Sequence, residues 1–119
     1  MANPVHVTIK TFEPCTGLCL GNSAGCTPQV HEVKADKGET ITFHNHHTSE
    51  NITVTFFVEG SVSVQCTSVS PSSAIIESGG EADFYVAGER GSRCDIRLSY
   101  NQCTFDLAGV PKMIVGPAF

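Results

Sequence analysis

The sequence contains no tryptophan, few basic residues and no long apolar run. Seven Lys and Arg residues stand against twelve Asp and Glu residues, which gives a formal net charge of −5. Because the few basic residues form no patch, this composition argues against nucleic acids and anionic membrane surfaces as partners. No stretch approaches the ~20 consecutive apolar residues of a transmembrane helix, so we expect no membrane insertion.

Helical periodicity is missing as well. Apolar and polar residues instead alternate over short segments, most clearly in 52–58 and 94–100, with Gly, Pro, Asn and Ser between the segments. This alternation is typical of antiparallel β-strands that bury one face. We therefore predict an all-β protein, with residues 1–119 forming a single Greek-key β-sandwich or barrel of about seven or eight strands.

Six cysteines are many for 119 residues: Cys15, Cys19, Cys26, Cys66, Cys94 and Cys103. Such a count favours a disulfide-stabilised domain in an oxidising compartment, either extracellular or periplasmic. Residues 1–5 carry no apolar leader, so we expect a secretion leader to have been removed already. The spacing of the first three cysteines does not match the paired short knuckles of a zinc site, which is the alternative interpretation.

The connectivity of the cysteines stays open, although the pattern restricts it. Three lie before residue 30 and three after residue 60, so at least one bridge joins the two groups if all six pair. Residues 14–28 show no periodicity and are predicted to form a loop held by disulfides. Val62, Val64 and Cys66 predict a short strand with its cysteine inward, where Cys66 and Cys94 could meet across the core.

A histidine-rich segment carries most of the candidate chemistry. Residues 38–58 predict a hairpin of two strands joined by a polar turn. Successive side chains in a strand point to opposite faces, so Asn45 and Glu50 should point toward the core and His44 outward. His6, in the first predicted strand, is interpreted as a surface residue.

The same segment supplies the main metal candidates, His44, His46 and His47. His31 or Glu50 would complete a set of nitrogen and oxygen ligands suited to Cu(II) or Zn(II). Since neighbouring strand residues diverge, at most two of the three turn histidines can converge unless the loop bends. The alternative is a solvated polar turn whose histidines only form hydrogen bonds.

Three segments, in this order, resemble those of a known family. Residues 37–45 are similar to a glycine followed by a strand that ends in asparagine, residues 76–84 to a glycine turn into an aromatic strand, and residues 100–115 to a cysteine loop and closing strand. This order resembles the cupredoxins, small β-sandwich copper proteins. The resemblance implies a cupredoxin-like fold and copper as the cofactor.

The ligand positions implied by this resemblance are only partly occupied by ligands. Cys103 stands at the cysteine position, whereas Glu50 and Asp106 stand where the family has its two histidines. Val110 occupies the approximate axial position, with Met113 the nearest thioether. A blue-copper centre needs two imidazoles and a thiolate, so a conventional centre is not expected. Glu50 and Asp106 would lie near each other and either bind a hard cation or remain solvated loop acids.

Two hypotheses of function follow from the sequence. The first is a secreted cupredoxin-like domain that binds copper through an atypical His and carboxylate site, for storage, delivery or electron transfer. The second is a metal-free interaction or structural module, such as an extracellular subunit that self-assembles through its sheet edges. No serine or cysteine lies in a nucleophile context, so we expect no enzyme.

Overall fold

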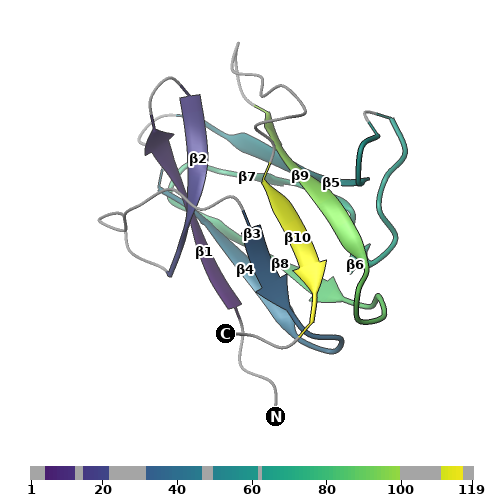
Figure 1. Cartoon of the computed structure of the whole chain (residues 1–119). Helices are drawn as coiled ribbons and strands as arrows, with labels where there is room; N and C mark the ends of the chain where they lie inside the picture. Colours follow the sequence, from purple (N-terminus) through teal and green to yellow (C-terminus); the bar gives the residue numbers. More distant parts are fainter. Residues whose placement is uncertain are drawn as a thin grey trace.

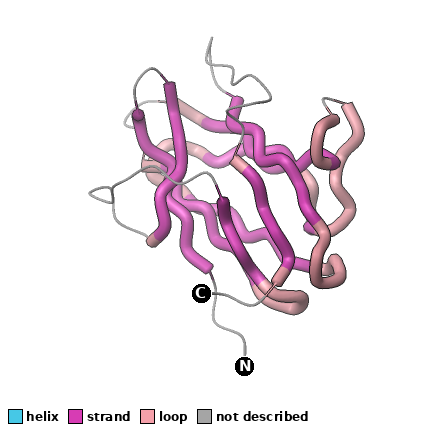
Figure 2. The backbone as a smooth tube through the Cα atoms, viewed as in Figure 1, coloured by secondary structure: helices cyan, strands magenta, loops and turns pink. Residues whose placement is uncertain are grey.

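The structure is a computed structural model that describes residues 5–12, 15–21, 32–46, 50–61, 63–99 and 111–116. These residues form strands, turns and loops, with no helix among them (Figure 2). Accordingly, the described part of the chain contains no helix long and apolar enough to cross a membrane. The strands are β1 (Val5–Phe12), β2 (Cys15–Leu20), β3 (Glu32–Ala35), β4 (Thr40–Asn45), β5 (Ile52–Val58), β6 (Val69–Ser70), β7 (Ser73–Ile76), β8 (Glu81–Val86), β9 (Arg93–Ser99) and β10 (Lys112–Val115).

Two five-stranded sheets pack face to face (Figure 1). The first sheet has the order β2-β1-β4-β8-β6, and the second has the order β3-β10-β9-β5-β7. Most neighbouring strands are antiparallel, but β1 runs parallel to β4 and β10 runs parallel to β3. The predicted all-β sandwich is confirmed, with ten strands among the described residues in place of seven or eight, because β2 and the short β6 were not anticipated.

The predicted hairpin over residues 38–58 is wrong. Its two strands are present as β4 and β5, but β4 belongs to the first sheet and β5 to the second. The histidine-rich connection therefore crosses from one sheet to the other. Alternation predicts each strand and its buried face, but it does not show whether two successive strands pair with each other.

Two further local predictions need correction. The predicted loop over 14–28 begins instead with β2, which pairs with the edge of β1 although its sequence alternates weakly. Of the predicted strand over 62–66, the described residues 63–66 form only a bridge, between Gln65 and Phe57. Cys66 does point inward as predicted, whereas the Val64 side chain is 56% exposed.

Three aromatic rings join the two sheets. Phe43 and Phe84 come from the first sheet and Phe56 from the second, and all three are fully buried. Their ring centroids lie 5.0 to 5.9 Å apart in edge-to-face arrangements. Edge-to-face pairs add about 0.5–1.5 kcal/mol each to the stabilisation from burial. Every second side chain of these strands points inward, and these inward side chains form the core.

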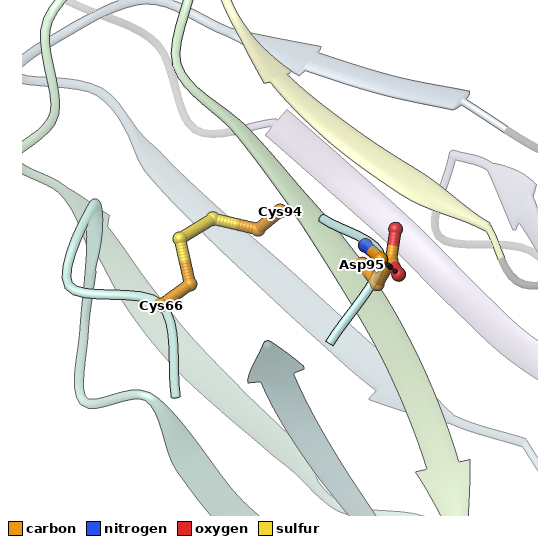
Figure 3. The surroundings of a disulfide bond; sticks show 4 residues. Cys66, Cys94 and Asp95 are labelled. Carbon is orange, nitrogen blue, oxygen red and sulfur yellow. Dashed lines mark hydrogen bonds between the residues drawn. A yellow bond between two sulfur atoms is a disulfide. The ribbon is translucent and has the colours of Figure 1, made fainter. Parts of the chain in front are cut away.

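A disulfide between Cys66 and Cys94 closes the region beside β9, with a Cα–Cα separation of 5.9 Å (Figure 3). The predicted meeting of these two cysteines is confirmed. Cys19 is also disulfide-bonded, and the pairing among the remaining cysteines involves residues outside the described part. Asp95, next to Cys94, points to the other side of β9 and is 1% exposed.

Candidate functional site

The end of β4 is anchored by Asn45. Its side chain is fully buried, and Nδ2 donates hydrogen bonds of 2.9 Å to the carbonyls of Glu50 and Ile76. The backbone N–H of Asn45 donates to Gly80, and the Asn45 carbonyl accepts from Gly79. The predicted inward direction of Asn45 is confirmed, and these bonds fix the strand end from which the histidines project.

His44 points to the outer face of the first sheet, as predicted from the alternation. Its neighbours there are His6 on β1 and Glu81 on β8, and its side chain is 16% exposed. The ring of His46 lies on the same side, 6.3 Å from the ring of His44 between centroids. The His46 backbone N–H donates to the carbonyl of Ile9, so His46 continues along β1 beyond the end of β4.

The two ring nitrogens of His44 have different partners. Nδ1 lies 3.2 Å from the Glu81 carboxylate, and Nε2 lies 2.9 Å from Nδ1 of His6. A carboxylate only accepts hydrogen bonds, so the tautomer of His44 that suits Glu81 has its proton on Nδ1. In the neutral ring Nε2 is then the acceptor, and His6 donates to it from Nδ1. The result is a linear array of carboxylate, imidazole and imidazole.

The predicted metal ligands are only partly brought together. His44 and His46 share one face, whereas Glu50 follows the crossing to the second sheet and is held through its backbone carbonyl by Asn45. The other candidates, His31, His47, Cys103 and Asp106, lie outside the described residues. Within the described ranges, no three His, Cys, Asp or Glu side chains form a group arranged to hold a metal ion.

Two residues of the array were missed by the sequence analysis. His6 is half-buried against His44 instead of being a simple surface residue, and Glu81 was not considered at all. Both sit on the outward parity of their strands, which is a signal that the sequence does contain. The missing information was the strand order, because β1 and β8 flank β4 only in the folded sheet.

Comparisons with known proteins add information on the fold. No family model and no curated protein sequence matches this chain. Among solved structures, Lac15 from a marine microbial metagenome is 18% identical with a TM-score of 0.53, over 95% of this chain and 32% of Lac15. A point mutant of amicyanin in its Cu(I) form is 11% identical with a TM-score of 0.49, over 93% of this chain and 82% of that chain.

A second point mutant of amicyanin, in its oxidised state, gives a similar result, with 10% identity, a TM-score of 0.49 and the same two coverages. This chain spans about a third of the length of Lac15, so the Lac15 likeness concerns one portion of a larger protein. At 18% identity, the structural likeness to Lac15 shows a shared fold and says nothing about chemistry. The TM-scores with amicyanin lie below 0.5, so this likeness supports no inference about the fold or the function.

The donor chemistry of this chain does not fit a blue-copper centre. A carboxylate, Glu50, stands at the position of the first histidine ligand, and its backbone is held by Asn45. The imidazoles of the described chain gather instead on the outer face of the first sheet, at His6, His44 and His46. The trigonal set of two imidazoles and a thiolate is therefore not supplied at the position that the resemblance implies.

Proposed function

We propose that this chain is a cupredoxin-like domain that binds Cu(II) through histidine nitrogens at the outer end of β4. The observation that carries the proposal is that His44 and His46 project from the same face, with ring centroids 6.3 Å apart. Asn45, between them, is turned into the core and held by two hydrogen bonds. The strand end is thus preorganised, so little entropy is lost when its imidazoles bind an ion.

The ligand types favour storage or delivery of copper over electron transfer. Neutral imidazole and oxygen donors suit Cu(II), whereas a thiolate and a thioether are the ligands that also accommodate Cu(I). Water and carboxylate oxygens, including Glu50 if its side chain reaches the site, would complete the coordination. An extracellular or periplasmic location is part of the proposal, supported by the disulfide-bonded Cys19, Cys66 and Cys94.

Titration of the disulfide-bonded protein with Cu(II), followed by calorimetry and visible absorption, tests this function. We expect saturable binding with weak colour, because intense blue requires thiolate-to-copper charge transfer. Affinity should fall below about pH 6, since only the neutral imidazole binds a metal. An intense blue band would instead assign the copper to Cys103.

The variant His46→Ala with His47→Ala should abolish the binding at the loop. Its circular dichroism spectrum and melting temperature should match those of the unmodified protein, because His46 is exposed. If the unmodified protein shows no saturable binding of Cu(II), the metal function is refuted. The metal-free interaction module then stands, and size-exclusion chromatography for self-assembly is the next measurement.

A further inference from the structure

We infer that Nδ1 of His6 and Nε2 of His44 bind Cu(II) together on the outer face of the first sheet, with Glu81 orienting the His44 ring. This inference rests on the proposed function and makes His6, in place of the loop histidines, the partner of His44, so His46→Ala with His47→Ala should then weaken binding without abolishing it. The sequence suggests a metal site made of His44, His46 and His47 with His31 or Glu50. The structure instead points to a pair of nitrogens from two parallel strands, 38 residues apart.

The parallel pairing of β1 and β4 brings the two rings together. In this register His6 lies beside Thr42 and Thr8 lies beside His44, so the histidines are diagonal neighbours on one face. Thr8 is fully buried and its hydroxyl donates to the carbonyl of Gly21, so this hydroxyl is engaged with the backbone and not with the rings. The ring centroids are 5.1 Å apart and the ring planes are tilted by 31°.

The separation of the two nitrogens fits ligands of one ion. Nitrogen ligands lie about 2.0–2.1 Å from a metal ion, so two of them are about 2.9 Å apart at a right angle and about 3.3 Å apart at a tetrahedral angle. Nδ1 of His6 and Nε2 of His44 are 2.9 Å apart. In the metal-free protein this is the length of a hydrogen bond, and it also places the two nitrogens close enough to bind one ion.

Glu81 determines which nitrogen of His44 is available. Its carboxylate, 3.2 Å from Nδ1, keeps the proton on that nitrogen and leaves the Nε2 lone pair directed at His6. Metal-binding histidines in proteins commonly donate their other ring N–H to a carboxylate in this way. Glu81 faces His44 directly across the antiparallel pair of β4 and β8. It is thus a positioning residue and not a ligand.

The pair supplies only two ligands, because the described residues contain no group of three His, Cys, Asp or Glu side chains arranged to hold a metal ion. Water or His46 would occupy further positions around the ion. In the metal-free array His6 carries its proton on Nδ1, so binding requires this proton to move to Nε2 of the same ring.

The variant His6→Ala tests the pair directly. Cu(II) titration by calorimetry should show binding weakened by more than about 100-fold, a larger loss than removal of an orienting partner causes. The nitrogen hyperfine pattern of bound Cu(II) in electron paramagnetic resonance should lose one imidazole. The matched control is Thr42→Ala, because Thr42 is the β4 residue beside His6 and carries no imidazole. His6→Gln serves if the alanine variant does not fold.

Glu81→Gln tests the orienting role, and its expected effect is binding weakened by about 10–100-fold. Asp83→Asn is the matched control, since Asp83 lies on the same face of β8 but accepts a hydrogen bond from Thr42. In the metal-free protein, nitrogen NMR should show the His44 proton on Nδ1, and Glu81→Gln should shift the ring toward the Nε2-protonated form. This spectroscopic change would not follow from a purely structural role of Glu81.

The outcomes separate this inference from the function on which it rests. If His6→Ala binds Cu(II) with unchanged affinity and an unchanged nitrogen pattern, the pair is refuted and the loop histidines hold the ion. A His44 ring protonated on Nε2 in the metal-free protein also refutes it. If the unmodified protein does not bind Cu(II), the proposed function and the pair both fail.

Discussion

The outer faces of the two sheets carry different chemistry. On the second sheet, Arg93 donates to Glu59 at 2.8 Å, and Lys112 donates to the buried Asp95 at 2.7 Å. On the first sheet, the imidazoles of His6 and His44 face each other next to the carboxylate of Glu81. One face holds matched opposite charges, and the other holds two imidazoles beside a carboxylate.

The two ion pairs on the second sheet stabilise the fold. The hydrogen bond from Arg93 holds the pKa of Glu59 below its usual value, and the hydrogen bond to Asp95 raises the pKa of Lys112. Each group is thus stabilised in its charged form by its partner. The partner of His6 is another imidazole and not an opposite charge, so its nitrogen can serve a ligand at little cost to the fold. This difference predicts that changes on the second sheet affect stability and that changes on the first affect binding.

The largest effect on stability should come from the disulfide beside the second sheet. Replacing both Cys66 and Cys94 by alanine should lower the free energy of unfolding by about 2–5 kcal/mol, mainly because the unfolded chain gains freedom. Denaturation in urea, followed by circular dichroism, measures the change. An unchanged midpoint would show that this bridge contributes nothing to the second sheet.

Asp95→Ala should give the next largest effect. The carboxylate is buried, accepts from the backbone N–H of Gly60 at 3.0 Å and pairs with Lys112. Its removal leaves a half-buried ammonium and a backbone donor without this acceptor, at a cost of about 2–4 kcal/mol. Asp95→Asn, which keeps an acceptor for Gly60, should cost less in the same urea experiment. Equal effects of both variants would show that the charge, not the Gly60 bond, is decisive.

His44→Ala on the first sheet should cost less stability than Asp95→Ala. It removes the hydrogen bond with His6 and the contact with Glu81 from a partly exposed ring, and we expect a loss of about 0.5–1.5 kcal/mol. The same variant should remove the binding of Cu(II). The comparison between the sheets fails if His44→Ala destabilises the protein as strongly as Asp95→Ala does.

The smallest effect concerns an exposed ion pair that is separate from the ion pairs of the second sheet and from the imidazoles of the first. Arg90 forms a bidentate ion pair with Asp36, and its hydrogen bond lowers the pKa of that carboxyl. A lowered pKa stabilises the fold above the ordinary value of about 3.9 and ceases to do so as the pH falls through the folded value. Asp36→Asn should therefore slightly reduce the change in unfolding midpoint between neutral and strongly acid pH. An identical pH profile would refute this contribution.

The sequence by itself determined most of the strands and their buried faces, although it missed β2 and β6. Alternation with period two is a local property, so it placed Phe43, Asn45 and Cys66 inward and His44 outward without knowledge of any neighbour. The same argument allowed Cys94 to be matched with Cys66, since both side chains had to enter the core. The all-β class followed from the same pattern.

Only the tertiary structure decided which strands lie side by side. β4 and β5 are consecutive in the chain yet lie in different sheets, while β1 pairs with β4, so that His6 meets His44 across 38 positions of sequence. Such pairings depend on the packing of the whole core and on loop closure, whose entropic cost varies only slowly with loop length. For this reason the contacts of His6 and Glu81 with His44 exist only in the folded molecule, and the site that we propose lies on the face of the sheet and not in the loop.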